Sequence, residues 1–358
     1  MTAHPHHARL DRLRGDVPAK RHNARTIAAL TGNPGCNRRA VLDAAGVDKP
    51  ALAERIGFPA AFGQSRFALA RGTAFEAMLK ADGCALLRAV LGLTTETSIG
   101  YDDLGDDSDD TLSARHARTR ELLAGGVAGA ALIDHPLLTL DVAGQRVFLE
   151  PDLLAYQEKG RLRVVEIKSF AIVDGQADAA KVSAAAVQAA VYVLALRRLF
   201  GELGHDEALV SHEAVLVCPE DFSLRPTAVV LDVRKQLSTL RRQLARLASV
   251  SSLVADLPVA VTFDVAAPVD DLLSSLAAVT ARYAPECLST CELSGYCRHE
   301  SAGTLAALGR PVREALGGIE TVPEALALAA GKSPPPELAE AAALLREAAR
   351  LRSEALTS

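Results

Sequence analysis

The sequence of 358 residues has no tryptophan, six cysteines and no long hydrophobic run. Six cysteines are too few for the disulfide scaffold of a small secreted domain. The longest apolar run, residues 184–196, is interrupted by Gln188 and is too short to cross a bilayer. The N-terminal residues are polar and lack the apolar core of a signal peptide. We therefore expect no membrane partner and a reducing cytoplasm, where thiols are free, catalytic or metal-bound.

An excess of basic charge is also missing, because the formal net charge at pH 7 is −5. This excludes a protein that coats nucleic acid by bulk electrostatics, but it allows a local basic track or a metal-mediated phosphate site. Six aspartates fall within residues 101–110. The segment lacks the spacing of a calcium loop, so we interpret it as an acidic, solvated loop.

Periodicity and turn residues divide the chain into three expected parts: a flexible polar arm at 1–25, a main domain at 26–302, and a helical appendage at 303–358. Helical patterns precede, separate and follow segments with strand patterns, which predicts an α/β fold with a central mixed sheet flanked by helices. Helices are expected at 66–91, 111–124, 177–200, 233–250 and 269–283, and strands at 137–142, 146–156, 161–170, 213–219 and 227–233.

Charged side chains gather on two neighbouring expected strands. Glu166 and Lys168 are two residues apart and so project from one face of a strand, whereas Ile167 points into a core. If the turn is centred on Lys159–Gly160, paired positions sum to about 319, and Asp152 lies opposite Ile167. The alternative is an exposed hairpin with a Glu–Lys ion pair.

Two carboxylates beside an ammonium suit a hard divalent cation, because Mg²⁺ prefers carboxylate and carbonyl oxygens. A metal-bound water has a lowered pKa and becomes a nucleophile at neutral pH. Asp152 and Glu166 would supply the negative charge. Lys168 would orient the water or stabilise charge that develops on a phosphate.

Two expected helices carry further polar residues. Gln188 and Tyr192 are four residues apart in an otherwise apolar helix, so they share one face. Their alternative role is that of a buried Gln and Tyr that satisfy backbone groups. Upstream, Gly72 is followed four residues later by Glu76, which is either a ligand for a hard cation or an exposed helical carboxylate.

Three cysteines lie close together near the end of the main domain, Cys287, Cys291 and Cys297, and Cys36 lies far upstream. Four thiolates can hold an iron–sulfur cluster or a zinc ion, and spacing alone does not decide between them. Unligated thiols are the third alternative. The remaining two, Cys84 and Cys218, lie in apolar segments and are expected in the core.

Taken in order, these motifs resemble the PD-(D/E)XK nuclease superfamily, with Pro151-Asp152 followed by Glu166-Ile167-Lys168. Gln188 and Tyr192 look like the Q-x-x-x-Y motif of RecB-type nucleases. Gly72 to Glu76 resembles their G-x-x-x-H motif, with Glu76 in place of the histidine. One cysteine before this core and three after it resemble the CRISPR-associated RecB-like exonucleases and AddB-type nuclease domains, although Cys287-x3-Cys291 has one residue more than their usual C-x2-C.

The resemblance implies a restriction-endonuclease-like core and a helical region clipped by a 4Fe–4S cluster. It also implies a metal-dependent DNA exonuclease, acting on single-stranded DNA or DNA ends in DNA repair, CRISPR adaptation or phage defence. No Walker A sequence is present, so unwinding would need a partner helicase. The alternative is a non-catalytic DNA-binding or scaffold subunit.

The residues that the resemblance assigns fall into four groups. The first two are the ligands of Mg²⁺ or Mn²⁺ and the groups that activate water and position the strand. The other two are the cluster ligands and the phosphate contacts. The metal ligands are Glu76, Asp152, Glu166 and the Ile167 carbonyl, and the groups that activate water and position the strand are Lys168, Gln188 and Tyr192. The cluster ligands are Cys36, Cys287, Cys291 and Cys297, and the phosphate contacts are Arg38, Arg39, Arg66 and Arg71.

Overall fold

The computed structural model describes residues 5–60, 66–93, 100–105, 111–125, 132–143, 145–157, 161–221, 223–248 and 250–357. The chain divides into two compact units. One unit comprises Met1–Ala19, Gly32–Gly63 and Ser251–Ser358, and the other comprises Lys20–Thr31 and Gln64–Val250. This division differs from the three expected parts, because residues 32–63 belong with the C-terminal segment and not with the sheet.

The second unit is built on a six-stranded sheet in the order β1-β2-β5-β6-β7-β8. The pairs β1–β2 and β6–β7 are parallel and the other pairs are antiparallel. The expected α/β class, with a mixed sheet flanked by helices, is therefore confirmed. The strands are β1 (Tyr101–Asp103), β2 (Leu132–Asp134), β5 (Leu153–Gln157), β6 (Arg161–Ile167), β7 (Glu213–Pro219) and β8 (Pro226–Asp232).

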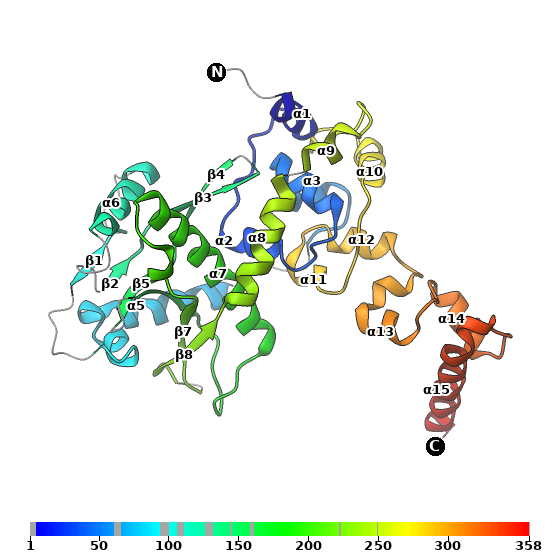
Figure 1. The fold of residues 1–358 in the computed structure, drawn as a ribbon. Helices are drawn as coiled ribbons and strands as arrows, with labels where there is room; N and C mark the ends of the chain where they lie inside the picture. The colour runs from blue at the N-terminus through cyan, green and yellow to red at the C-terminus, as the bar shows by residue number, and fades with distance from the viewer. Residues whose placement is uncertain are drawn as a thin grey trace. The chain divides into compact units, whose positions relative to one another are not determined.

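Helices α5 (Arg66–Val90) and α7 (Ala179–Glu202) cover opposite faces of this sheet (Figure 1). Phe75 and Leu79 of α5 share one buried cluster with Val165 of β6 and Val217 of β7, whereas α7 packs against alternate strand positions such as Leu216. Side chains that alternate along a strand face opposite sides, so each helix covers its own set. The parallel β6–β7 pair needs such a crossover helix.

Helix α7 is also long and apolar enough to cross a membrane, judged by length and composition alone. However, 56% of its most apolar window is buried inside the protein, and it packs against β6 and β7. This is the environment of a core helix. Helices α2 (Ala24–Ala29), α6 (Leu112–Ala124) and α8 (Arg234–Ala248) complete the second unit.

The expected strand at 146–156 is two strands in the structure. Residues 150–152 separate β4 (Gln145–Leu149) from β5, because Pro151 has no N–H to donate to a ladder. β4 pairs with β3 (Leu138–Val142) in a separate two-stranded sheet. β5 pairs with β6 so that Leu153 lies opposite Val165, one residue from the predicted register, and the next step along brings Asp152 to Glu166.

Two short strands, β1 and β2, were not expected from the sequence. β1 begins inside the segment interpreted as an acidic loop, and residues 106–110 of that segment lie outside the described residues. The expected helix at 66–91 corresponds to α5, whose backbone leaves helical angles between Ala81 and Cys84. This kink divides the expected helix into two.

The first unit is helical over most of its described residues. Residues 1–25 were expected to be a flexible arm, but residues 5–14 form helix α1 (Pro5–Arg14) and pack against the unit. Leu13 is fully buried, and Arg14 Nη1 donates to the Ala45 carbonyl at 2.8 Å. The other helices before residue 303 are α3 (Asn37–Ala45), α4 (Lys49–Arg55), α9 (Val250–Ala255, which begins one residue before this unit), α10 (Val269–Ala277), α11 (Cys287–Thr290) and α12 (Ser294–Glu300).

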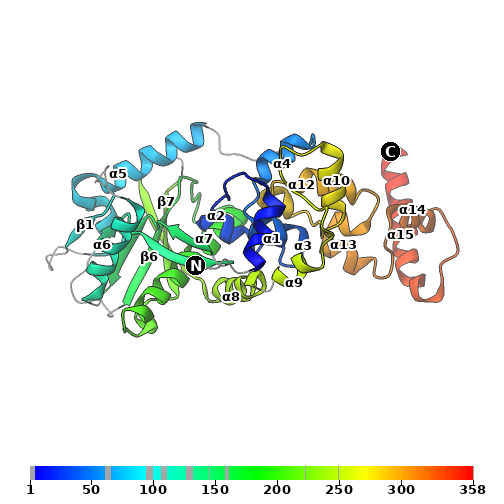
Figure 2. The same cartoon turned by 90° about the horizontal axis from the view of Figure 1, so that it is seen from above.

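The expected helical appendage contains α13 (Arg310–Ala315), α14 (Val322–Ala329) and α15 (Ala339–Thr357). Helices α14 and α15 pack side by side (Figures 1 and 2). They share a small apolar cluster that includes Leu328 and Ala342. This cluster gives the last part of the chain a core of its own.

Candidate functional site

The carboxylates and the lysine that the sequence placed on two strands meet at the C-terminal end of β6. Glu166 is fully buried, and its Oε1 forms an ion pair with Lys168 Nζ. Asp152 Oδ2 accepts a hydrogen bond from the Ile167 N–H at 2.7 Å. Glu166 Oε2 is buried and has no hydrogen-bond partner among the residues that the structure describes. A buried anionic oxygen without a partner is costly, so this atom marks a place for a further positive or donating group.

The pKa shifts of Glu166, Asp152 and Lys168 also indicate a site that favours a further cation. Burial, and then the negative charge of Asp152, raise the pKa of Glu166 to about 8. Burial also raises the pKa of the Asp152 carboxyl. Burial alone would lower the pKa of Lys168, but the charges of Glu166 and Asp152 outweigh it and raise that pKa. Two buried carboxylates therefore share the Lys168 ammonium, and a further cation beside them would be favoured by their charge.

Gln188 and Tyr192 lie on α7, on the side that faces these carboxylates. Gln188 Nε2 donates to the Tyr192 hydroxyl at 3.2 Å, and Tyr192 is 4% exposed. Burial, and then the charge of Glu166, raise the pKa of the Tyr192 phenol. The hydroxyl thus remains a neutral donor close to Glu166.

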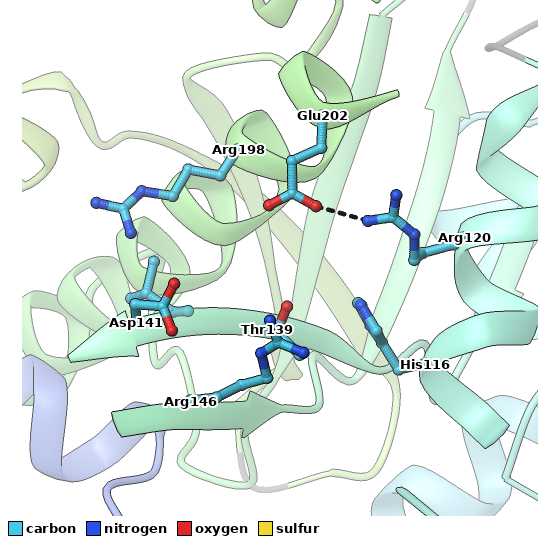
Figure 3. Close-up of a pocket in the computed structure, with 8 residues that line it drawn as sticks. His116, Arg120, Thr139, Asp141, Arg146, Arg198 and Glu202 are labelled. Atoms are coloured by element: carbon cyan, nitrogen blue, oxygen red, sulfur yellow. Dashed lines mark hydrogen bonds and ion pairs between the residues drawn. The ribbon is translucent and has the colours of Figure 1, made fainter. Parts of the chain in front are cut away.

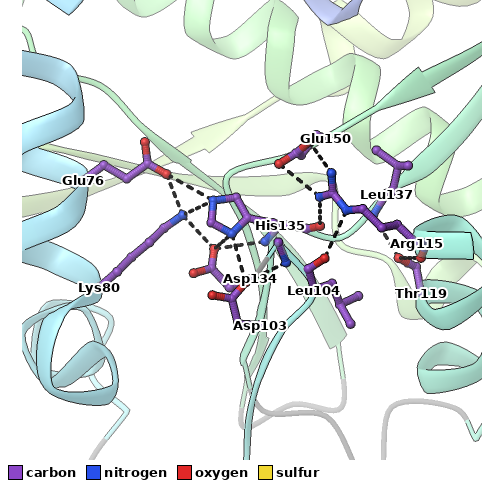
Figure 4. Close-up of polar contacts among 11 residues, drawn as sticks. Glu76, Lys80, Asp103, Leu104, Arg115, Thr119, Asp134, His135, Leu137 and Glu150 are labelled. Carbon is purple, nitrogen blue, oxygen red and sulfur yellow. Dashed lines mark hydrogen bonds and ion pairs between the residues drawn. The ribbon is translucent and has the colours of Figure 1, made fainter. Parts of the chain in front are cut away.

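Glu76 reaches the same group of charges from α5. Its negative charge adds to the raised pKa of Asp152 and of Glu166. Glu76 Oε1 lies 2.5 Å from Lys80 Nζ, one helical turn further along α5. Lys80 in turn lies 2.7 Å from the buried Asp134 Oδ1 (Figure 4). Glu76 is therefore held by a lysine that is anchored in the sheet.

Sequence reasoning missed this anchor. Among the described residues, Asp103, Asp134 and His135 form the one group whose three ligand atoms lie within 4.8 Å of one another. Lys80 Nζ lies 3.0 Å from His135 Nε2, and the Tyr101 hydroxyl donates to Asp134 Oδ2 at 2.9 Å. The Lys80 ammonium is thus the cation of this group. Asp134 ends a three-residue strand and His135 follows it, and a strand of this length is too short for a periodic signal.

We expect Lys80→Met to lower the free energy of unfolding by about 3 kcal/mol, because Asp134 is fully buried and would lose its cation. Burial would lower the pKa of Lys80, but its bonds to Asp134 and Glu76 raise it, so the lysine is charged in the wild type. Urea denaturation measures the change. Lys235→Met, on the exposed side of α8, is the control, and equal losses in the two variants would contradict this role.

Two arginines predicted as phosphate contacts lie on α5. Arg71 is exposed, and its Nη2 donates at 2.6 Å to the carbonyl of Ser169, the residue after Lys168. Arg66 is exposed in the first turn of the helix. The structure therefore brings Arg71 to the edge of the carboxylate group and leaves Arg66 on the surface.

The four cysteines predicted to act together belong to the first unit. Cys287, Cys291 and Cys297 are buried on or beside α11 and α12, and Cys36 precedes α3. All are unpaired thiols. The charge of Cys36 acts on Cys297, and Asn33 Nδ2 donates to Cys287 Sγ at 3.1 Å. Burial raises the pKa of Cys291 to about 12 and that of Cys297 to about 11.

Arg38 and Arg39 lie beside these sulfur atoms and not on the surface. They are 2% and 5% exposed, so neither offers its guanidinium to a phosphate from solution, which corrects their predicted role. Arg38 Nη1 donates to Cys297 Sγ at 3.3 Å and pairs with Glu300 at 2.7 Å. Arg39 Nε lies 3.3 Å from Asp43, and Arg39 Nη1 is buried with no hydrogen-bond partner within the described ranges.

The spacing of the sulfur atoms bears on which metal they could hold. All four cysteines are among the described residues, and no three of their sulfur atoms lie within 4.8 Å of one another. Zinc–sulfur bonds of about 2.3 Å in a tetrahedron hold the thiolates roughly 3.8 Å apart. The arrangement is thus wider than a single zinc ion needs. The other two cysteines, Cys84 and Cys218, are fully buried in the sheet unit, as expected for core residues.

Comparison with known proteins adds little to this geometry. No protein-family model matches the chain, and no curated protein matches it. A solved structure described as "Crystal structure of SSO0001" is 11% identical in sequence. The match covers 58% of this chain and 86% of that chain, with a TM-score of 0.21. A likeness this low carries no argument about fold or activity, so the function has to be argued from the two sites.

Proposed function

We propose that the protein is a metal-dependent nuclease of the PD-(D/E)XK type that hydrolyses phosphodiester bonds in DNA. One observation carries this proposal. In the described part of the chain, Glu166 Oε2 is a fully buried carboxylate oxygen without a hydrogen-bond partner, next to Asp152, and Lys168 is the ammonium paired with Glu166. A divalent cation bound at that oxygen would balance the charges of the two carboxylates.

The donors around Glu166 Oε2 are those that a hard cation prefers. Asp152, Glu166, Glu76 and the Ile167 carbonyl would offer oxygen atoms only, which favours Mg²⁺ or Mn²⁺ over zinc or copper. When bound, the metal would supply a Lewis acid and a water of lowered pKa.

The protein's own side chains would complete the site. Lys168 Nζ lies beside Glu166 and would stabilise negative charge that develops on the phosphate. Tyr192, held by Gln188, would donate to a phosphate oxygen, and Arg71 would hold the strand at the edge of the site. Single-stranded DNA or DNA ends, a partner helicase, a cytoplasmic location, and a role in DNA repair, CRISPR adaptation or phage defence rest on the family resemblance.

The test is a cleavage assay with labelled single-stranded DNA and Mn²⁺, with EDTA as the metal-free control. We expect Mn²⁺-dependent product from the wild type and from Asp141→Asn, an exposed carboxylate on β3. Asp152→Asn should give none. Circular and end-blocked substrates then separate an exonuclease, which needs an end, from an endonuclease. Equal activity in both variants would refute the proposed site.

A DNA-binding or scaffold subunit is the second candidate, and Glu76 in place of the family's histidine is the observation that favours it. Glu76 already forms an ion pair with Lys80, which it shares with Asp134, so a metal would have to compete with the lysine for this carboxylate. A scaffold would bind labelled DNA with no product at any Mg²⁺ or Mn²⁺ concentration. The same assay therefore decides between the two candidates.

We expect the affinity for Mn²⁺ to rise with pH up to about 8 and then to level off. The pKa of Glu166 is raised to about 8 in the metal-free protein, so below that pH a metal must displace its proton. Each pH unit below 8 should weaken binding by up to about tenfold. Mn²⁺ titration followed by electron paramagnetic resonance measures this. Glu166→Gln should bind weakly with little pH dependence, and a flat wild-type profile would contradict the assignment.

We further propose that Cys36, Cys287, Cys291 and Cys297 hold a 4Fe–4S cluster that stabilises the first unit. The buried Arg39 Nη1, which has no hydrogen-bond partner among the described residues, supports this, because a buried N–H donor without an acceptor calls for an accepting group beside it. The charge of Arg39 acts on Cys291. A cluster held by four thiolates would provide such a group, as well as the wide sulfur spacing.

Replacing Arg38 should change the redox properties of this cluster and leave its iron in place. Hydrogen bonds and positive charge at cluster sulfurs raise the reduction potential, and Arg38 Nη1 donates to Cys297 Sγ. We expect Arg38→Gln to retain iron and to show a lower midpoint potential in a spectroelectrochemical titration. Arg313→Gln, exposed on α13, is the control. An unchanged potential in Arg38→Gln would exclude this influence.

A further inference from the structure

A pocket in the sheet unit gathers arginines away from the candidate active site. It encloses about 280 Å³ and is lined by Arg161 at the start of β6, Arg197 on α7 and His212 just before β7. Glu207, on the short 3-10 helix Glu207–Leu209, lines its rim. We call this cavity the arginine pocket.

The arginines of this pocket are held close enough to repel one another. Arg197 is fixed, because its Nε and Nη2 both donate to the Val210 carbonyl, at 3.3 and 3.0 Å. Burial, and then the positive charges of Arg241 on α8 and of Arg161, lower the pKa of Arg197. Arg161 and Arg241 have no ion-pair partner among the residues that the structure describes. Like charges kept together in this way cost free energy unless an anion joins them.

We propose that the arginine pocket binds a phosphate monoester group. Two arginines line the pocket against one carboxylate, Glu207, and the charge of Arg241 on α8 also acts on Arg197, so positive charge is in excess there. A phosphate monoester carries about −1.5 to −2 at pH 7. Guanidinium groups are planar and donate two hydrogen bonds at once to a phosphate, which a lysine cannot do. The pocket volume exceeds that of one phosphate and leaves room for an attached sugar.

This group is not the one that the candidate active site would hydrolyse. Arg161 and Glu166 are five residues apart on β6, or about 17 Å along the strand. The phosphate monoester could be the terminal phosphate of a DNA strand, and that source rests on the proposed function. The other source is inorganic phosphate or a free mononucleotide, and this source does not depend on the proposed function.

The next residue on α7, Arg198, provides a matched control. It lines a different cavity of about 300 Å³ together with Arg120 and Arg146 (Figure 3). There Glu202 forms an ion pair with Arg120 at 2.6 Å, and Asp141 adds a second carboxylate, so this cavity differs from the arginine pocket in holding an arginine that is already paired. Arg198→Ser removes an exposed arginine from the same helix without touching the arginine pocket.

The experiment compares wild type, Arg161→Ser/Arg241→Ser and Arg198→Ser, all without divalent metal. Inorganic phosphate binding is measured by calorimetry at low salt. Fluorescence anisotropy then measures binding of one single-stranded oligonucleotide with and without a terminal phosphate, at either end. We expect the double variant to bind inorganic phosphate at least about tenfold more weakly and Arg198→Ser to bind as the wild type does. Both replaced arginines are exposed, so the fold should be retained, and circular dichroism checks this.

Each result has one meaning. If the double variant loses phosphate binding and also loses the advantage of the phosphorylated oligonucleotide, the pocket holds the end of a strand. If it loses phosphate binding alone, the pocket holds a free phosphate compound. If wild type, double variant and Arg198→Ser bind phosphate equally, the proposal is overturned. Cleavage is measured separately, so the phosphate-binding measurement still tests the arginine pocket if the protein does not cleave DNA.

Discussion

Lys168→Met is expected to lower the rate of Mn²⁺-dependent hydrolysis of single-stranded DNA by about 10³-fold, as measured by product formation under single-turnover conditions. Lys168 is the one ammonium that pairs directly with Glu166, and methionine keeps its length without its charge. The phosphate gains negative charge in the transition state, and no other cation among the described residues lies as close to Glu166. The loss should therefore appear in the chemical step.

Binding data separate this role from a structural one. Without Lys168, the two carboxylates Asp152 and Glu166 repel each other more strongly, so the metal becomes their main counter-ion. Mn²⁺ binding should persist in Lys168→Met even though turnover is lost. Lys181→Met, on the exposed first turn of α7, should retain full activity. A Lys168→Met rate within about threefold of the wild type would remove the lysine from the mechanism.

The local part of the carboxylate group was predictable from the sequence. Glu166 and Lys168 share a face by strand periodicity. A turn predicted at residues 159–160, which lie outside the described residues, placed Asp152 within one residue of the observed strand register. Gln188 and Tyr192 share a face by helical periodicity and form a hydrogen bond in the structure. These predictions depend on spacings within one or two elements, which sequence patterns record directly.

The contacts between side chains of different helices and strands could not be predicted from the sequence. Lys80 on α5 joins Glu76 to Asp134 on β2, a three-residue strand with no pattern of its own. The division of residues 146–156 into β4 and β5 depends on Pro151, whose missing N–H stops one ladder and permits the strand to join another sheet. Such features follow from tertiary packing, which decides where a short segment finds its partners.

The arginines beside Cys36 illustrate the same limit. Two adjacent basic residues after a cysteine suggest a surface that meets phosphate, and sequence alone assigns no partner to them. The structure gives Arg38 a partner in Glu300, which is 262 residues away, and gives Arg39 one in Asp43. Arg38 is thus neutralised by a residue that is distant in the sequence, which no local pattern records, whereas Arg39 and Asp43 lie one helical turn apart on α3.

Cys291→Ser is expected to remove the iron and the visible absorbance of the anaerobically purified protein and to lower the unfolding midpoint of the first unit by about 10 °C. The four cysteines come from two segments separated by about 250 residues, so a bound cluster would join them at one point. Loss of such a metal site should cost about 4 kcal/mol, which corresponds to roughly 8–16 °C for a unit of this size. Iron analysis and differential scanning calorimetry measure both effects.

Cys218→Ala is the control for this experiment. Cys218 is as fully buried as a cluster ligand, but it lies in β7 of the other unit, so its loss should leave the iron content unchanged. Zinc in place of iron in the wild type would replace the cluster by a single ion, and the stability loss in Cys291→Ser would remain. Neither metal in the wild type, with equal unfolding midpoints for wild type and Cys291→Ser, would show that the four thiols are unligated. The buried Arg39 Nη1 would then need another anion.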